Sequence, residues 1–302
     1  MKKKIVLGIG TFKRNELLKK ALNGVLKMHL SEDINLEVIV VDNSLDKEAR
    51  CVIDEYKNTR FKIHYFSEIK KSIAAVRNKA LKEAINLNAD YIAFMDDDAV
   101  PDKNWILNLY NALLKYNADV VTGWQGSIID NIIQPIPKRI LKRKTGEKRT
   151  FCCTNNVLFK SEIITKSNLW FDESYGLMTG EDVDFFERAF KSGYKIIWCE
   201  NAYVYETQTA DRLNFEFWID REYNNGYMSV FKARKHNSLN ENKIYKQALA
   251  NLFLYSLIAF LSIIFRNKKE NKNIIKIFRN VGKLNSLYSK KAYQHYKRDN
   301  EG

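Results

Sequence analysis

Short apolar segments alternate with helix-like segments over the first 95 residues, and this alternation constrains the fold more than any other feature. The strand-like runs are residues 4–9, 36–41, 61–66 and 91–95, and the helix-like stretches between them are residues 16–28, 46–57 and 72–87. Strands and helices in such alternation form right-handed βαβ units. The sequence therefore predicts an α/β fold, with a mostly parallel central sheet flanked by helices.

Charge is distributed unevenly along the chain, whose net charge is +14. Residues 232–302 contain 16 Lys and Arg and four Asp and Glu, a net charge of +12, whereas residues 1–231 carry only +2. A basic tail on a nearly neutral body points to an anionic partner, for which nucleic acid and anionic lipid both qualify. We predict a globular domain at 1–231 and a basic helical tail at 232–302.

The tail contains Ala248–Phe265, 18 residues without a charge. This length is near the lower limit for a spanning helix, and basic residues on both sides, at 243 and 246 and within 266–269, give no clear orientation. The segment is therefore a membrane span, a re-entrant or interface-lying helix, or a buried core helix. The amphipathic basic segment 274–291 suits an anionic membrane surface and favours membrane association.

The start of the chain and the cysteines both favour a cytoplasmic protein. The first apolar stretch is only about six residues long before Lys13, too short for the core of a signal peptide. The four cysteines show no CxxC spacing. We therefore expect reduced thiols and no export signal.

Three consecutive aspartates, Asp96, Asp97 and Asp98, follow the apolar run 91–95. Ligands of open α/β sheets bind beyond the carboxyl ends of strands, so the aspartates are expected at the active site. Clustered carboxylates repel one another, and their hard oxygen atoms suit Mg²⁺ or Mn²⁺, particularly when phosphate oxygens complete the coordination. The alternative is a solvated turn that caps the next helix.

A second acidic pair, Glu181 and Asp182, begins a helical pattern with apolar residues at 185, 186 and 189. The helix macrodipole favours acidic residues at this position without any chemistry, which is the structural alternative. Two acidic groups on one α/β domain nevertheless allow one to hold a metal while the other removes a proton.

Between the two acidic groups, residues 137–149 contain seven basic residues and one acidic residue. Charge runs of this kind are usually solvated mobile loops. Beside an active site and a membrane-seeking tail, the run is equally suited to grip the pyrophosphate of a lipid-linked acceptor. Both interpretations stay open at this point.

Six short motifs occur in order along roughly residues 3–235. They are Ile5–Arg14, Val40–Ser44, Ala75–Asn78, Phe94–Asp98, Asn155–Phe159, and Phe171–Glu173 together with Gly180–Asp182. In this order they resemble the signatures of glycosyltransferase family 2, whose members have the GT-A fold. The resemblance implies a nucleotide-sugar donor, expected to be a UDP-sugar, a divalent cation bound at the DXD motif, and inversion at the anomeric carbon.

The resemblance also implies roles for individual residues. Those expected to bind the nucleotide sugar are Thr11, Phe12, Arg14, Asp42, Arg77, Asp96 and Asp97. Asp98 and Asp96 are expected to hold Mn²⁺ or Mg²⁺, and Glu206 is a further candidate ligand because a histidine common in related sequences is absent there. Asp182 is the expected catalytic base, with Glu181 as the second choice.

We therefore expect an inverting, metal-dependent glycosyltransferase of hexosyltransferase type at the cytoplasmic face of the inner membrane. It would transfer sugar to a hydroxyl of a glycan or lipid-linked acceptor in surface polysaccharide synthesis, with the nucleotide sugar, the acceptor and the anionic membrane as partners and no nucleic acid. Two alternatives remain. Asp96-x-Asp98-x-Val100 fits the nucleophile pattern of haloacid-dehalogenase-like phosphohydrolases, and a non-enzymatic nucleic-acid-binding protein would use the basic tail.

Overall fold

The computed structural model describes residues 2–135, 137, 140, 142–209, 212, 214–264 and 270–289. Phe265, the basic residues within 266–269 and the end of the predicted segment 274–291 lie outside this part. The chain forms two compact units. The sheet unit comprises Met1–Glu173 and Glu181–Gln208, and the helical unit comprises Ser174–Gly180 and Thr209–Gly302. The predicted first domain, 1–231, thus contains residues of both units.

One ten-stranded sheet forms the centre of the sheet unit, with the order β3-β2-β1-β4-β9-β6-β10-β5, β7 beside β6 and β8 beside β10. The strands are β1 (Lys3–Thr11), β2 (Ile34–Asp42), β3 (Lys62–Ser67), β4 (Tyr91–Met95), β5 (Ala99–Pro101), β6 (Val120–Ile129), β7 (Ile132–Ile133), β8 (Lys148–Arg149), β9 (Asn156–Lys160) and β10 (Ile196–Thr207). The β3-β2-β1-β4 half is parallel, as predicted, whereas β9 runs antiparallel to both β4 and β6. The predicted α/β fold is confirmed.

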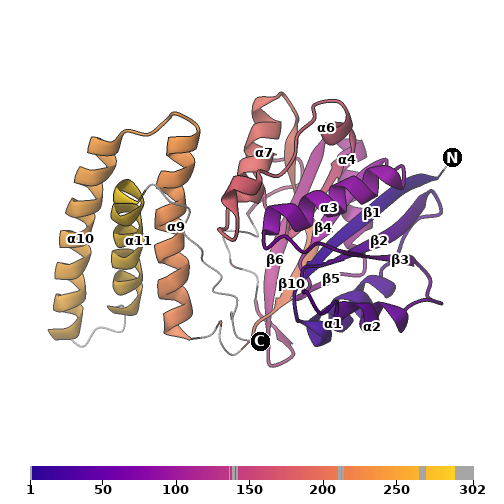
Figure 1. The fold of residues 1–302 in the computed structure, drawn as a ribbon, viewed down its shortest axis with the longest axis horizontal. Coiled ribbons are helices and arrows are strands. Elements are labelled where there is room, and N and C mark those ends of the chain that lie inside the picture. The colour runs from indigo at the N-terminus through magenta and orange to yellow at the C-terminus, as the bar shows by residue number, and fades with distance from the viewer. Residues whose placement is uncertain are drawn as a thin grey trace. The chain divides into compact units, whose positions relative to one another are not determined.

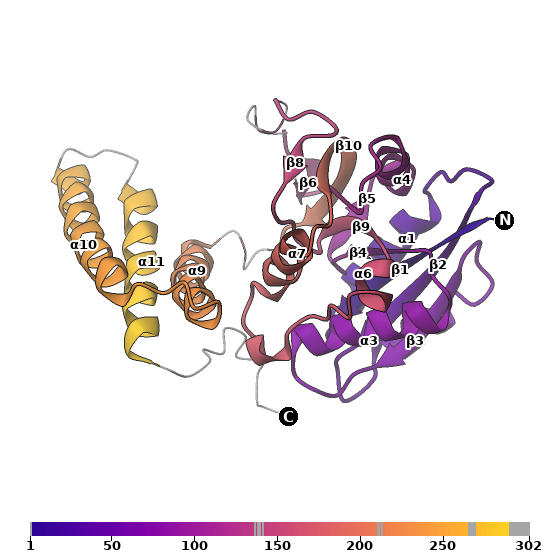
Figure 2. The same cartoon turned by 90° about the horizontal axis from the view of Figure 1, so that it is seen from above.

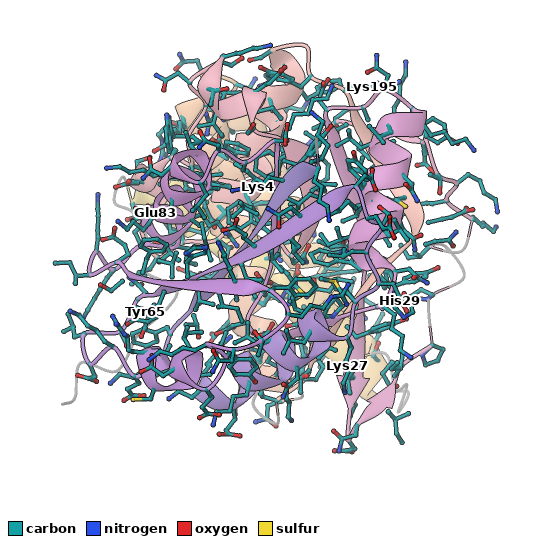
Figure 3. The ribbon with its side chains drawn as sticks, turned by 90° about the vertical axis from the view of Figure 1, so that its right-hand side faces the viewer. Lys4, Lys27, His29, Tyr65, Glu83 and Lys195 are labelled. Carbon is teal, nitrogen blue, oxygen red and sulfur yellow. The ribbon has the colours of Figure 1, made fainter. Side chains whose placement is uncertain are left out.

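Helices cover both faces of this sheet (Figures 1 and 2). They are α1 (Asn15–Leu26), α2 (Ala49–Asp54), α3 (Ile73–Asn86), α4 (Trp105–Lys115), α6 (Glu162–Thr165) and α7 (Glu181–Lys191), and a 3₁₀ helix η1 spans Glu173–Tyr175. Leu22 of α1 and Ile106 of α4 belong to the apolar core on one face, and Leu81 of α3 and Phe186 of α7 belong to the core on the other. The charged side chains of Lys27 and Lys195 lie on the outside (Figure 3).

Local sequence explains where the elements next to the site begin. Ser72 caps α3, because its hydroxyl accepts the backbone N–H of Ala75 at 3.3 Å. Helix α2 begins later than the predicted residue 46, since Lys47 adopts a left-handed conformation with φ of +54° that a helix cannot include. Gly180 has φ of +104°, a conformation that favours glycine, directly before α7.

The parallel strands bring the polar residues that follow them to one edge of the sheet, which we call the carboxyl edge. Thr11, at the end of β1, is paired in register with Asp42, at the end of β2. β4, all five residues of which are buried, ends at Met95 beside these strands, so the three aspartates follow at the same edge. The sheet therefore gathers side chains from three strands into one place, as expected for a ligand site in an α/β fold.

The helical unit contains α9 (Phe215–Lys235), α10 (Glu241–Ile264) and α11 (Glu270–Tyr288). Helix α11 lies between α9 and α10 in both views (Figures 1 and 2). Its backbone approaches that of α9 closely: a Cβ atom on Gly226 would lie 1.8 Å from the carbonyl oxygen of Arg279, and one on Gly282 would lie 2.0 Å from that of Tyr223. Two glycines thus permit this helix contact.

Helix α10 contains the predicted uncharged segment up to residue 264. Among the described residues, one helical segment is long and apolar enough to cross a membrane, namely Glu241–Ser262, and little of it is buried. A core helix of a soluble protein is mostly buried, whereas Phe253 is 75% and Phe260 60% exposed. The exposure of α10 argues against the core-helix interpretation.

Candidate active site

The triplet after β4 meets the loop after β1. The Thr11 hydroxyl donates to Asp97 Oδ2 at 2.8 Å, and Arg14 Nη1 lies 3.4 Å from Asp97 Oδ1 and 3.2 Å from Asp98 Oδ2. Asp97 and Asp98 are buried, while the Arg14 side chain is 39% exposed. Four of the predicted site residues therefore form one hydrogen-bonded group at the carboxyl edge, and Phe12 lies within the same β1 loop.

Arg77 of α3 joins the triplet to the second acidic group. Its Nη1 forms an ion pair with Glu181 Oε1 at the start of α7, and its Nη2 lies 4.0 Å from Asp96 Oδ1. Glu181 is only 2% exposed. Its carboxylate is therefore committed to holding the Arg77 guanidinium beside Asp96.

Asp182 has a different environment from its neighbour. Its Oδ2 accepts the backbone N–H of Thr154 at 3.3 Å, and its Oδ1 accepts the N–H of Val183 at 2.7 Å. The side chain is partly exposed. These contacts orient the carboxylate while solvent still reaches it, so Asp182 suits a proton acceptor better than the buried, ion-paired Glu181.

Glu206 lies next to the triplet through β10. It is paired in register with Ala99 of β5, and the backbone N–H of Thr207 donates to the carbonyl oxygen of Asp98 at 2.7 Å. The Gln125 amide of β6 donates to Glu206 Oε2 at 3.0 Å and accepts from the Asn155 amide. The Asn155–Gln125–Glu206 chain thus orients the carboxylate that the sequence singled out.

Asp42 is fully buried below the carboxyl edge. Its Oδ1 accepts the N–H of Ser44 at 2.8 Å, and its Oδ2 accepts the N–H of Ala49 and the Tyr65 hydroxyl, each at 3.1 Å. These three donors fix the turn between β2 and α2. The structure therefore gives Asp42 a role in shaping the loop beside Thr11, and its predicted contact with the nucleotide sugar stays a prediction.

Crowding of negative charge changes the proton affinity of the site. Burial raises the pKa of Asp97 to about 6, although Arg14 and the Thr11 hydroxyl oppose the rise. Burial and the charge of Asp98 raise the pKa of Asp96 to about 7. The Asp96 side chain is 40% exposed, so water screens part of this effect, whereas Asp97 is buried. Burial raises the pKa of Glu181 to about 7, but direct contact with Arg77 favours the ionised pair.

The donor set has the chemistry that a divalent cation requires, because carboxylate oxygens are hard ligands. The guanidinium groups that lie beside this carboxylate cluster belong to Arg14, which contacts Asp97 and Asp98, and Arg77, which contacts Asp96 and Glu181. Among the described residues, no three His, Cys, Asp or Glu side chains converge closely enough to hold an ion by themselves. Phosphate oxygens of a bound molecule are suitable as additional hard ligands.

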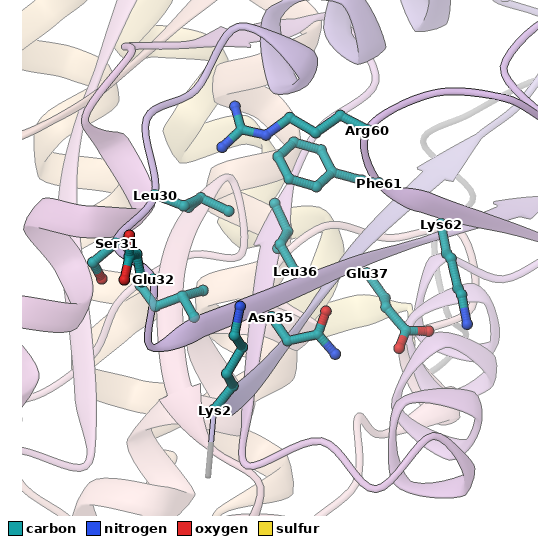
Figure 4. Close-up of a pocket in the computed structure, with 11 residues that line it drawn as sticks. Lys2, Leu30, Ser31, Glu32, Asn35, Leu36, Glu37, Arg60, Phe61 and Lys62 are labelled. Atoms are coloured by element: carbon teal, nitrogen blue, oxygen red, sulfur yellow. The ribbon is translucent and has the colours of Figure 1, made fainter.

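A pocket of about 440 Å³ lies at the other end of the strands. Its walls include Leu36 and Glu37 of β2 and Arg60, Phe61 and Lys62 at the start of β3 (Figure 4). These residues precede the strand segments that lead to the carboxyl edge. The pocket is therefore separate from the candidate active site.

Comparison with known proteins decides the family. The model of glycosyl transferase family 2 matches residues 7–166, which is more than half of the chain. The chain belongs to glycosyltransferase family 2. The predicted family and the prediction of a glycosyltransferase are thereby confirmed, and the phosphohydrolase and non-enzymatic alternatives are not retained.

Proteins similar to this chain in sequence or structure support the assignment. The succinoglycan biosynthesis protein ExoM of Rhizobium meliloti (strain 1021) is 27% identical over 236 residues, which cover 74% of this chain and 72% of ExoM. The mannosyltransferase PcManGT from Pyrobaculum calidifontis, solved with GDP-Man and Mn²⁺, has a TM-score of 0.67 at 15% identity over 95% of this chain and 88% of its own. Staphylococcus aureus TarS 1–349, solved with UDP-GlcNAc, has a TM-score of 0.59 at 13% identity over 93% and 91%. The structural likeness establishes the GT-A fold.

Two contributions to this glycosyltransferase site were missed by sequence reasoning. The Thr154 N–H holds Asp182, and Gln125 holds Glu206. A backbone donor leaves no sequence signal, and Gln125 is marked only as a polar residue in the apolar run of β6. Asn155 belonged to a recognised motif, but its contact with Gln125 depends on β6 and β9 being neighbours.

The basic segment 137–149 is described only in part, since Lys138, Arg139 and Leu141 lie outside the described residues. In β8, Lys148 and Arg149 pair with Ile197 and Ile196 at the start of β10, whereas Glu206 is near its end. The described end of the segment is thus attached to the opposite end of β10 from Glu206. Its predicted grip on an acceptor pyrophosphate stays a prediction.

Proposed function

We propose that this glycosyltransferase is an inverting, metal-dependent enzyme that transfers a hexose from a nucleoside diphosphate sugar to an acceptor hydroxyl. The observation that carries the proposal is the cluster of carboxylates at the carboxyl edge, where Asp96, Asp97 and Asp98 lie beside the guanidinium groups of Arg14 and Arg77. A divalent cation that also binds the donor diphosphate would neutralise this charge. The partly exposed Asp182 nearby supplies the second function that inversion needs, a base.

The donor would bind with its diphosphate near Asp98 and Arg77. Asp98 and Asp96 would hold the cation, with Glu206 as a further candidate ligand, and Thr11, Phe12, Arg14 and Asp97 would border the nucleotide. The bound cation supplies charge stabilisation for the leaving nucleoside diphosphate. Arg77 adds a guanidinium whose interaction strengthens as the diphosphate gains negative charge, which lowers the barrier to bond breaking.

The acceptor would approach from the side of Asp182. A sugar hydroxyl is a poor nucleophile at neutral pH, so a carboxylate that accepts its proton assists the attack. Attack opposite the leaving diphosphate inverts the anomeric carbon in one step. Thr154 and Val183 orient the Asp182 carboxylate for this role, while Glu181 positions Arg77.

Polysaccharide synthesis is the biological setting that the relatives favour. ExoM is a succinoglycan biosynthesis protein, and it covers most of this chain. We therefore propose a glycan or lipid-linked acceptor and a location at the cytoplasmic face of the inner membrane. The structural relatives were solved with different donors, GDP-Man and UDP-GlcNAc, so the proposed UDP-sugar donor rests on the family resemblance.

A screen of nucleotide sugars by thermal unfolding tests the proposed activity. A ligand present at 100 times its Kd stabilises the folded state by about 2.7 kcal/mol, which is readily measured as a rise in Tm. We expect one nucleotide sugar to protect the protein in the presence of Mn²⁺ and much less in its absence. If no nucleotide sugar protects the protein with either Mn²⁺ or Mg²⁺, the proposed donor class is wrong.

Membrane association is tested separately with the full-length chain. Hydrophobic insertion of α10 predicts that the protein sediments with vesicles, stays bound in high salt and is released by detergent. Complete release by salt would leave only an electrostatic contact of the basic tail. A full-length protein that stays soluble and does not bind vesicles would contradict the proposed membrane partner.

A further inference from the structure

The outer surface of α10 is a continuous apolar stripe. Ala250, Phe253, Leu257 and Phe260 follow one another at spacings of three and four residues and are all exposed, so they lie on one side of the helix. Leu249, Leu254 and Leu261 are also exposed and widen the stripe. Over the residues whose side chains the structure describes, the stripe extends from 249 to 261, about 18 Å at 1.5 Å per residue.

The other side of α10 is occupied by α11, which runs antiparallel to it. A hydrogen bond joins Tyr245 to Tyr288, and Asn251 Nδ2 donates to Asn280 Oδ1 at 3.4 Å. Further along, the Lys276 ammonium lies 4.9 Å from the centre of the Tyr255 ring. The apolar part of α10 therefore lies alongside a charged part of α11.

This pairing makes a membrane span unfavourable. If α10 crossed the bilayer with α11 beside it, Lys276 and Arg279 would enter the hydrocarbon with it. Arg279 Nε lies 3.4 Å from Glu222 of α9, so the charged Glu222 side chain would also enter the hydrocarbon. Charged side chains at the bilayer centre are costly, and a helix that lies in the interface keeps them in water.

The charged residues next to the stripe indicate which kind of surface binds it. Lys246 precedes Ala250 by four residues and lies on the same exposed side of α10, and Lys243 is exposed one turn earlier. The tail as a whole carries a net charge of +12. An apolar stripe that begins with lysines on a basic tail matches a layer of anionic lipid headgroups over hydrocarbon.

We infer that α10 lies parallel to an anionic lipid surface and immerses only its outer stripe, with α11 on the aqueous side. This inference rests on the proposed membrane association and adds its geometry: the helix binds one leaflet and does not span. α11 covers the inner side of α10, and the contact between α11 and α9 keeps the charged residues together in water. The membrane partner is thus recognised by one face of one helix.

Depth measurements along α10 test this geometry in the full-length protein bound to phosphatidylglycerol-containing vesicles. Single nitroxide labels would be attached at Ala250→Cys, Phe253→Cys, Leu257→Cys and Phe260→Cys, with Cys51 and Cys153 replaced by serine. Depth follows from the relative collision rates with oxygen and a water-soluble nickel chelate. We expect all four labels at one shallow depth, about 5–10 Å below the headgroups. A label at Asp220→Cys, exposed on α9, should stay in water.

Other results of the depth measurement distinguish the in-plane geometry of α10 from membrane association as such. A change in depth of about 15 Å between positions 250 and 260 would show a spanning helix, which overturns the in-plane geometry but keeps the membrane association. Four labels that stay in water with vesicles present would overturn both. Labels that are shielded without lipid, in a chain of doubled mass, would assign the stripe to a second copy and overturn the lipid assignment.

Two variants test the same inference through the strength of vesicle binding. Phe253→Ser combined with Phe260→Ser removes two aromatic side chains from the stripe and should weaken vesicle binding at least tenfold. Both positions are exposed, so the fold should tolerate the change, which a thermal melt verifies. Ser229→Ala alters an exposed serine of α9, outside the stripe, and should bind vesicles as the unmodified chain does. Equal binding by all three proteins would contradict the assignment.

Discussion

Asp182 and Glu181 are neighbours in the sequence, yet α7 gives their carboxylates different tasks. Glu181 is buried against Arg77, whereas Asp182 is partly exposed and held by the Thr154 N–H. We predict that Asp182→Asn lowers kcat by roughly 10²–10⁴-fold and leaves donor affinity unchanged, because the carboxylate acts only as the hydroxyl attacks. Single-turnover transfer and donor titration measure the two effects.

Glu187→Gln is the matched control, since Glu187 lies on the same helix outside the site contacts described above. It should retain the unmodified rate. A loss of donor affinity in Asp182→Asn with an unchanged single-turnover rate would assign Asp182 to binding and leave the base unidentified.

The raised pKa values of Asp97, about 6, and Asp96, about 7, predict a pH-dependent response to Mn²⁺. A carboxyl group whose pKa is raised by folding stabilises the fold at low pH and loses that contribution as pH rises from its unfolded value, about 4, to its folded value. The metal-free protein should therefore lose stability between about pH 4 and 7.

Cation binding requires the charged form, so Mn²⁺ affinity should rise about tenfold per pH unit for each proton released below the folded pKa. Calorimetric titration from pH 5.5 to 7.5 measures this rise, and saturating Mn²⁺ should remove the loss of stability. Asp96→Asn should reduce the pH dependence. An affinity that does not change over this interval would contradict the role of these carboxylates in cation binding.

At the residue scale, the sequence predicted which carboxylates gather but not what holds them. Three aspartates after a buried run had to lie at the end of a strand, and β4 ends there. The donors that orient Asp182 and Glu206 come from residues 154 and 125, which become neighbours only when β6, β9 and β10 pair. Asp42 was predicted as a ligand contact, whereas its buried hydrogen bonds also make it a structural anchor.

Among the secondary-structure elements, β6 contributes the side-chain amide of Gln125 to the site. Gln125 donates to Glu206 and accepts from Asn155, so it fixes the orientation of a candidate ligand carboxylate. Residues that orient metal ligands typically contribute 10–100-fold to metal affinity. We predict that Gln125→Ala weakens Mn²⁺-dependent donor binding by roughly that factor while metal-free nucleotide binding changes little. Unchanged Mn²⁺ affinity would show that Glu206 or its orientation plays no part in binding the cation.

The contact between α9 and α11 depends on Gly226 and Gly282. From sequence alone, glycine within a helix is expected to destabilise it. A Cβ atom on Gly282 would lie 2.0 Å from the carbonyl oxygen of Tyr223, so the two helices would have to separate. We predict that Gly282→Ala destabilises the protein by about 1–3 kcal/mol, as overpacking of a tight contact does. Denaturant unfolding measures the change, and a variant as stable as the parent would contradict the backbone contact.

At the scale of the whole molecule, the sequence predicted the parallel half of the sheet because each helix there follows its strand directly. It did not predict the antiparallel β9, which inserts between β4 and β6 after about 60 intervening residues. The net charge predicted a boundary at residue 231, which lies within α9. The structure instead changes from the sheet unit to the helical unit after Gln208, because α9 packs with α11, and the charge pattern does not predict this helix pairing.

The central claim is that Asp98 helps to hold a divalent cation on the donor diphosphate. The most direct measurement is calorimetric titration of the protein with the nucleotide sugar identified in the screen, with and without Mn²⁺, for the parent chain and for Asp98→Asn. The account predicts Mn²⁺-dependent binding in the parent chain and its loss in a folded Asp98→Asn variant, together with loss of sugar transfer. Undiminished Mn²⁺-dependent binding by folded Asp98→Asn would contradict the account.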